Sequence, residues 1–258
     1  MSFGADLTAC AQLVERGDPD RFAATMAAPV ETRKVLFPIY AFNIEVSRAP
    51  WVTQEAIIAE MRLQWWTDAL DEIASGGLVR RHEVVTSLAH VLDETAARQL
   101  QRAVQARLWD VYRDPFEDQA ALSRYIEDTS ASLLLAASHS LSNEMPEALT
   151  DLGYAMGLAQ FLRAVPELER LGRRPLVDGR PEAVRDLASE GLDRLVKSRR
   201  ARATIPPKAR PVTLAAWQAG PILKQAKSDP RRVADGTLGL SEAARKTRLM
   251  WQAATGRW

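Results

Sequence analysis

The chain has 258 residues, 47% of them hydrophobic and 26% charged, and a formal net charge of +1. This length and composition predict a single domain, residues 1–258, with a sizeable core, and the balanced charge argues against nucleic acid as the main partner. The single cysteine, Cys10, excludes an internal disulfide and a cysteine metal cluster, which favours the reducing cytoplasm.

Residues 6–28 predict two short helices with a break between Gly17 and Pro19. Asp18 is suited to cap the second helix and Pro19 to open it. A third helix is expected from about Val30. The sequence has no run of about 18 apolar residues, so no membrane-spanning helix is predicted, and the acidic residues near the N-terminus argue against a signal or transit peptide.

Pro50 is expected to end the third helix, because proline lacks a backbone donor and disfavours helix at the residue before it. Thr53 is suited to cap the next helix, in which apolar residues recur at intervals of three and four until Gly76. Trp65 and Trp66 are adjacent on this helix. They could form a ligand platform, but an aromatic pair on an apolar stripe favours core packing.

Two further helices are predicted within residues 82–112, the second beginning at Asp93, and a long helix is predicted over residues 118–141. His139 lies in the apolar part of the long helix. A catalytic or metal-binding role is one interpretation, because histidine titrates near neutrality. A hydrogen-bonded structural histidine is favoured, since the sequence has no HxxxH or HExxH spacing.

Beyond residue 180, helices are predicted from Pro181 to about Arg202, around Trp217, and from Ser241 to Trp251. The first of these ends in a basic run. Such a run can dock on an anionic membrane or a partner, but a solvated end that complements the helix dipole is the favoured interpretation. The basic residues are Lys197, Arg199, Arg200 and Arg202.

Residues 40–42 (Tyr-Ala-Phe) resemble a segment of squalene and phytoene synthases. In those all-α enzymes, as the resemblance implies, a DxxxD motif follows on the same helix and holds Mg²⁺ against a prenyl diphosphate. Counting forward places Ser47 and Trp51 at the two aspartate positions. Carboxylates four residues apart would share one helix face, and neither carboxylate is present in this chain.

A later segment resembles the second aspartate-rich motif of the same family. Arg163 and residues 172–173 (Gly-Arg) match that pattern, but Ala164 and Leu168 stand where the two aspartates are expected. Pro166 is also expected to interrupt the helix between these positions. Both metal-binding motifs of the family are therefore absent from the sequence.

Within this family the chain resembles most a catalytically lapsed branch that includes the mitochondrial complex I assembly factor. The resemblance rests on residues 41–46 (AFNIEV), 61–66 (MRLQWW) and 162–166 (LRAVP), and it spans residues 20–180. It implies an all-α bundle of the isoprenoid-synthase type, no cofactor, and a respiratory complex I subunit or assembly intermediate as the protein partner. An isoprenoid or lipid ligand and peripheral contact with the inner face of a membrane are further expectations.

No catalytic residue and no metal site is predicted. Polar side chains within apolar helical stretches need partners when they are buried. Together with two aromatic residues, they are predicted to line a ligand-binding cavity: Tyr40, Asn43, Glu45, Arg62, Gln64, Trp65 and Arg163. A polar network that only fixes helix packing would explain them equally well.

The alternative function is a prenyl transferase that condenses isoprenoid diphosphates. It would need unconventional Mg²⁺ ligands, for which Glu45, Asp68 and Glu72 are the candidates. Mg²⁺ is expected as a cofactor only in that case.

Overall fold

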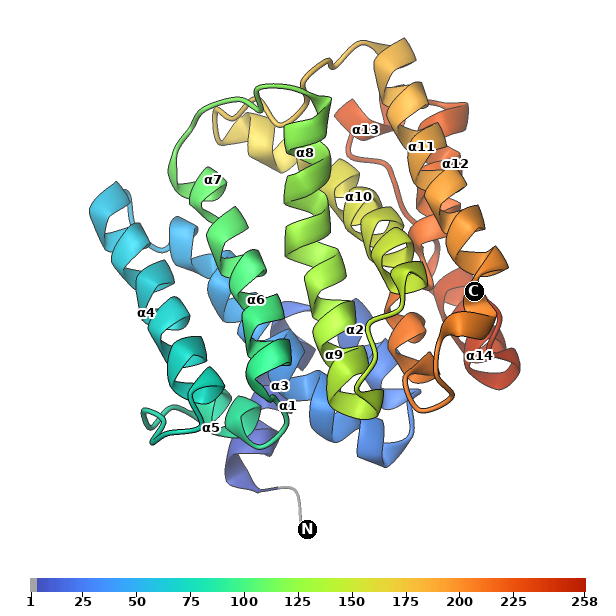
Figure 1. The fold of residues 1–258 in the computed structure, drawn as a ribbon. Helices are drawn as coiled ribbons and strands as arrows, with labels where there is room; N and C mark the ends of the chain where they lie inside the picture. The colour runs from blue at the N-terminus through green and yellow to red at the C-terminus, as the bar shows by residue number, and fades with distance from the viewer. Residues whose placement is uncertain (1–3) are drawn as a thin grey trace.

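The computed structural model describes residues 4–258, and this part of the chain is built from helices without any strand (Figure 1). The predicted all-α class is confirmed. Buried residues from Cys10 to Leu238 form one continuous hydrophobic core. The single-domain organisation over residues 1–258 stays a prediction, which this continuous core supports.

The α-helices of the described part follow in chain order. They are α1 (Ala5–Gly17), α2 (Pro19–Met26), α3 (Val30–Arg48), α4 (Ala56–Ala74), α5 (Glu83–Ala89), α6 (Glu94–Ala106), α7 (Leu108–Val111), α8 (Gln119–Ile126), α9 (Ser132–Ser142), α10 (Glu147–Arg170), α11 (Pro181–Arg200), α12 (Ala219–Ser228), α13 (Arg231–Ala234) and α14 (Glu242–Thr255). Short 3₁₀ segments are η1 (Ala49–Trp51), η3 (Arg202–Thr204) and η4 (Arg210–Ala216), and η2 (Glu127–Ala131) is a π-helical segment.

The longer helices lie side by side. In Figure 1, α4, α6, the continuous run of α8 and α9, α10 and α11 follow one another across the molecule, and each contacts the next. Helices α1 and α3 pack against each other and against α5, and α12 packs on α10 and α11. The centre of the bundle therefore lies between α3, α9 and α10, and any site there is built from distant parts of the sequence.

Short-range signals placed several helix starts correctly. Asp18, Asp93 and Asp118 each accept a hydrogen bond from the backbone N–H three residues ahead, at 2.9, 2.9 and 2.7 Å. These N-caps satisfy donors that have no partner inside the helix. Thr53 does not cap a helix. Its hydroxyl accepts from the backbone N–H of Glu55 at 3.1 Å, one residue before α4 begins.

The two prolines near the expected metal positions behave differently. Helix α3 ends at Arg48 and a 3₁₀ turn with Pro50 inside it follows, as predicted. The prediction that Pro166 interrupts its helix is wrong, because α10 continues past Pro166 to Arg170. Leu162 and Val165 flank the proline in the core, at 0% and 1% exposure, and their burial offsets the lost backbone hydrogen bond.

Helix α10 approaches the π-helical segment closely through two glycines. A Cβ added at Gly153 would lie 2.4 Å from the Cα of Ala131, and one added at Gly157 would lie 2.6 Å from the Cβ of Ser130. No side chain fits at such distances, so glycine is required at both positions. This close contact sets the distance between α10 and the α8–α9 run.

Candidate functional site

A cavity of about 350 Å³ lies in the bundle, between the C-terminal part of α3, α10, and the region of α7 and α8. Ser47 and Trp51 line it from one side, and Ala164 and Leu168 line it from α10. These are the four positions at which the resemblance to the synthases predicts carboxylates. The structure therefore brings the two altered motifs together around one cavity.

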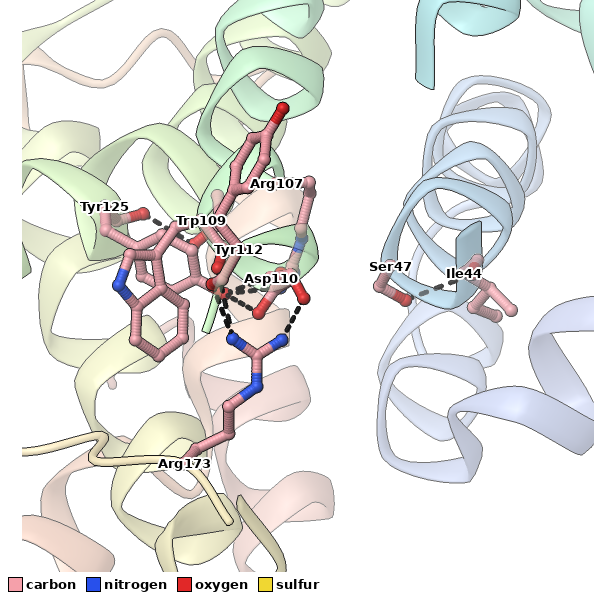
Figure 2. A network of polar contacts seen from close by, with 9 residues as sticks. Ile44, Ser47, Arg107, Trp109, Asp110, Tyr112, Tyr125 and Arg173 are labelled. Atoms are coloured by element: carbon pink, nitrogen blue, oxygen red, sulfur yellow. Dashed lines mark hydrogen bonds and ion pairs between the residues drawn. The ribbon is translucent and has the colours of Figure 1, made fainter. Parts of the chain in front are cut away.

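The side chains at the first altered motif make other contacts. The hydroxyl of Ser47 donates to the carbonyl oxygen of Ile44 at 3.0 Å (Figure 2). The Trp51 ring lies 5.1 Å from the guanidinium carbon of Arg173 in a cation–π contact. Across the cavity, Ala164 and Leu168 carry no polar atom in their side chains, so these four positions offer no carboxylate to a metal ion.

Asp110 is a carboxylate that does line the cavity, and it is 3% exposed. Its oxygens accept hydrogen bonds from Nη1 of Arg107 at 3.0 Å and from the hydroxyl of Tyr125 at 3.0 Å. Burial raises the pKa of Tyr125, with Asp110 adding to the effect, so the phenol keeps its proton and remains a donor. Both partners hold the Asp110 carboxylate in place.

Arg173 supports the same cluster from behind. It is 7% exposed and donates to the carbonyl oxygens of Tyr112 at 2.6 Å, Trp109 at 3.4 Å and Asp110 (Figure 2). These carbonyls belong to the C-terminal end of α7, where no intrahelical donor is available. Burial lowers the pKa of Arg173, yet the guanidinium remains charged at any physiological pH.

We name the group formed by Arg107, Asp110, Tyr125 and Arg173 the Asp110 cluster. Sequence reasoning did not find it as a site. Two signals were available. One was the arginine that follows Gly172, a glycine with the left-handed φ of 78°. The other was the set of acidic and aromatic residues near the end of the helices predicted within residues 82–112. Neither signal shows that these segments meet.

The donor set in this part of the molecule does not fit Mg²⁺. Within residues 4–258, no three histidine, cysteine, aspartate or glutamate side chains lie close enough together to hold a metal ion. Glu45, Asp68 and Glu72, the alternative ligand set, are therefore not gathered at one place. Asp68 accepts from the amide of Gln64 at 2.7 Å, and Glu72 is paired with Arg80 at 2.6 Å.

A second concave surface, which we call the α3–α4 groove, has a volume of about 640 Å³. Glu45, Arg62 and Trp65 line it, together with Trp66 and His82. Its floor is aromatic: the Trp65 and His82 ring centres are 5.3 Å apart, and those of Trp66 and His82 are 5.5 Å apart. Three of the predicted cavity residues thus meet here rather than in the central cavity.

The other predicted residues are dispersed. Asn43 lines the central cavity, Tyr40 is buried at 1% exposure, and Gln64 lies on the exposed side of α4, where it lines a separate hollow of about 330 Å³. Arg163 is exposed and pairs with Asp20 at 3.3 Å. The expectation that all polar members lie in apolar surroundings is wrong for Arg62, Gln64 and Arg163, because their helix faces point to solvent.

The structural roles favoured for His139 and Trp66 agree with their contacts. His139 Nε2 lies 2.8 Å from the Asp93 carboxylate, which is the hydrogen-bonded role expected for it. Trp66 is 5% exposed and packs edge to face on Phe42 with ring centres 5.4 Å apart, so it belongs to the core. Trp65 is only partly buried and is the member of the pair that a ligand can reach.

The fold and the paired altered motifs define a protein built like a head-to-head prenyl synthase. The sequence model of squalene/phytoene synthase matches residues 14–176, and the chain belongs to that family. A dehydrosqualene synthase superposes with a TM-score of 0.79 at 15% identity, covering 96% of this chain and 95% of that chain. A squalene synthase from Alicyclobacillus acidocaldarius gives 0.66 at 16% identity, covering 86% and 93%. The predicted isoprenoid-synthase fold is thus confirmed.

Proteins that are similar to this chain in sequence are named for complex I assembly and not for a synthase. A Drosophila melanogaster protein named complex I assembly factor 6 homolog is 29% identical over 242 residues, which is 80% of this chain and 71% of that protein. The Bos taurus complex I assembly factor 6 is 25% identical over 172 residues, 61% of this chain and 48% of that protein. The chain thus spans about half the length of the bovine relative. Within residues 4–258, no helix is long and apolar enough to cross a membrane.

Proposed function

We propose that this chain is a non-catalytic member of the squalene/phytoene synthase family that acts in the assembly of respiratory complex I. One observation carries the non-catalytic part: Ser47, Trp51, Ala164 and Leu168 surround a single cavity without a carboxylate among them. Ionising an allylic diphosphate requires stabilisation of the charge that develops on the leaving group. The residues at these positions offer no means to gather Mg²⁺ for that purpose.

The names of the relatives support the assembly part of the proposal. The fly and bovine proteins that match this chain are named for complex I assembly. The solved synthases are under 25% identical and support the fold only. A complex I subunit or assembly intermediate is therefore the proposed protein partner, and the proposed location is cytoplasmic or peripheral at the inner face of the membrane.

The α3–α4 groove is the proposed binding surface for that partner. Met61 and Ile58 line it at 65% and 37% exposure, beside Trp65. Exposed apolar side chains gathered at one hollow with a polar rim are typical of protein interaction sites. Of the predicted residues, Glu45, Arg62 and Trp65 act here in this proposal, and Asn43 acts in the central cavity, where an isoprenoid or lipid would be held.

Catalysis is tested directly. Purified protein incubated with farnesyl or geranylgeranyl diphosphate and Mg²⁺ should release no pyrophosphate above background, while an active family member releases it under the same conditions. Steady release that stops on addition of EDTA would overturn the non-catalytic part of the proposal and restore the prenyl transferase.

Assembly is tested in the source organism. Deleting the gene should lower the amount of assembled complex I and NADH-linked respiration and leave squalene and other isoprenoid products unchanged. Complementation with Met61→Glu should fail, because a carboxylate in the groove opposes apolar contact, whereas Arg163→Ala lies outside the groove and should complement. Normal complex I with depleted isoprenoid products would contradict the proposal.

A further inference from the structure

Two arginines from distant helices converge at the start of α12. A Cβ added at Gly220 would lie 3.4 Å from Nη2 of Arg199 and 3.8 Å from Nη2 of Arg248. Arg199 comes from the last turn of α11 and Arg248 from α14. Both side chains are half-buried, and their terminal nitrogens lie over Gly220 beside Cδ2 of Leu195, which is 3.2 Å from the same added Cβ.

Neither guanidinium has a counter-charge. Among residues 4–258, no carboxylate forms an ion pair with Arg199 or Arg248. Within the described part of the chain, the only hydrogen bond of Arg248 goes from Nε to the carbonyl oxygen of Trp217, at 2.5 Å. Nε of Arg199 is buried and has no hydrogen-bond partner among residues 4–258. Burial lowers the pKa of Arg199, and the charge of Arg248 lowers it further.

Neighbouring cations on α11 differ sharply from this pair. Arg194 lies 2.7 Å from the Asp151 carboxylate, and Lys197 lies 2.7 Å from Glu147 and 3.1 Å from Asp151. The basic run recognised in the sequence is thus divided: Lys197 is neutralised within the protein, and Arg199 is not. Desolvating a charge without a counter-charge costs free energy, so each of the two unpaired arginines would be stabilised by an anion bound beside it.

The backbone adds positive potential at the same place. Gly220 is the second residue of the ten-residue helix α12, whose N-cap, Gln218, makes no side-chain hydrogen bond. Pro221 has no N–H, which leaves the amides of Ala219 and Gly220 as the donors at this helix start. The N-terminal end of a helix favours anions, and guanidinium groups bind phosphate oxygens in a planar, paired geometry.

From this convergence we propose that Arg199, Arg248 and the N-terminus of α12 form a binding site for a phosphate-type oxyanion. The oxyanion would be a free phosphate group or the phosphate of an anionic lipid headgroup. It would supply the counter-charge that the protein itself withholds. The side chains involved do not line the central cavity or the α3–α4 groove, so the proposal is independent of the assembly role.

The first test compares thermal unfolding in sodium phosphate and in sodium chloride at matched ionic strength. Wild type should unfold at a higher temperature in phosphate, and titration should give an apparent affinity that falls about tenfold or more in Arg199→Gln, as expected for a lost charge-assisted hydrogen bond. Arg200→Gln is the matched control, because Arg200 is the exposed neighbour of Arg199 on the same helix. It should bind phosphate like wild type.

The second arm identifies the source of the phosphate. Wild type is sedimented with vesicles of phosphatidylcholine plus phosphatidylglycerol. If Arg199→Gln no longer sediments with the vesicles and Arg200→Gln still does, the site binds a lipid headgroup. A phosphate response without such sedimentation assigns it to free phosphate. An equal phosphate response in wild type and Arg199→Gln, with equal sedimentation of both, overturns the proposal. Arg248→Gln should lose binding in the same assays.

Discussion

The Asp110 cluster and the Arg199–Arg248 pair each contain two arginines that are at least partly buried. The two regions differ in the hydrogen-bond acceptors and counter-charges that these arginines find. In the cluster, Arg107 has the Asp110 carboxylate at 3.0 Å and Arg173 has three backbone carbonyls. In the pair, no carboxylate of residues 4–258 forms an ion pair with either arginine. A satisfied network stabilises one conformation, whereas an unsatisfied pair leaves binding capacity for a ligand.

The same contrast applies to the central cavity. The acidic group at the cavity, Asp110, is held by Arg107 and Tyr125. The acidic group that remains at the cavity therefore supports the fold. The further groups that we propose to meet a partner or an oxyanion lie at the α3–α4 groove and at the start of α12.

The largest expected effect is at the centre of the satisfied network. Asp110→Ala leaves Arg107 partly buried and without its counter-ion, so the free energy of unfolding should fall by about 3–5 kcal/mol. Urea denaturation measures the change. Asp110→Asn keeps the shape and one acceptor and should lose less. Asp178→Ala, which removes an exposed ion pair, is the control. If Asp110→Ala lowers the free energy of unfolding by less than Asp178→Ala does, the network does not stabilise the fold.

Arg173→Ala should have the next largest effect. It removes the donor to three carbonyls at the end of α7 and the cation over the Trp51 ring, and the free energy of unfolding should fall by about 2–3 kcal/mol. The exposed neighbour Arg174 is the control, and Arg174→Ala should leave stability unchanged. If the two variants have the same free energy of unfolding, Arg173 does not stabilise the end of α7 as proposed.

Tyr40 offers an intermediate case, because its buried hydroxyl has no hydrogen-bond partner among residues 4–258. Burial raises its pKa from 10.0 to about 12. The folded state therefore holds the phenolic proton more tightly than the unfolded state, so this contribution to stability is complete below pH 10 and is lost as the pH rises towards 12.

Chemical denaturation between pH 8 and pH 11 checks this prediction. The free energy of unfolding should fall above pH 10 in wild type, and the fall should be smaller in Tyr40→Phe. At pH 8 the variant should be at least as stable as wild type, because the removed hydroxyl is buried and makes no hydrogen bond with residues 4–258. An unchanged pH dependence in Tyr40→Phe would assign the alkaline loss of stability to other groups.

The smallest effect is expected at the unsatisfied pair. In phosphate-free buffer, Arg199→Gln removes repulsion from Arg248 and breaks no hydrogen bond, so stability should stay the same or rise by a few tenths of a kcal/mol, about the size of a surface charge effect. Thermal unfolding of Arg199→Gln, compared with that of Arg200→Gln, measures this change in stability. A loss comparable to Arg173→Ala would show that Arg199 has a structural partner and would erase the contrast between the two regions.

The sequence by itself determined the features that depend only on residues close together in the chain. Asp18, Asp93 and Asp118 cap helices because their acceptors lie three residues from the donors. The lost aspartates at Ser47, Trp51, Ala164 and Leu168 also follow from counting along the chain, as does the likeness to the synthase family.

Tertiary structure decided which distant residues meet and which remain exposed. Arg173 reaches Asp110 across 63 positions, and Arg248 meets Arg199 above Gly220, although no local pattern links them. Packing also carried α10 past Pro166 and turned Arg62 and Gln64 to solvent. The physical reason is that capping energies act within one helical turn, whereas burial and ion pairing depend on the spatial arrangement of whole helices.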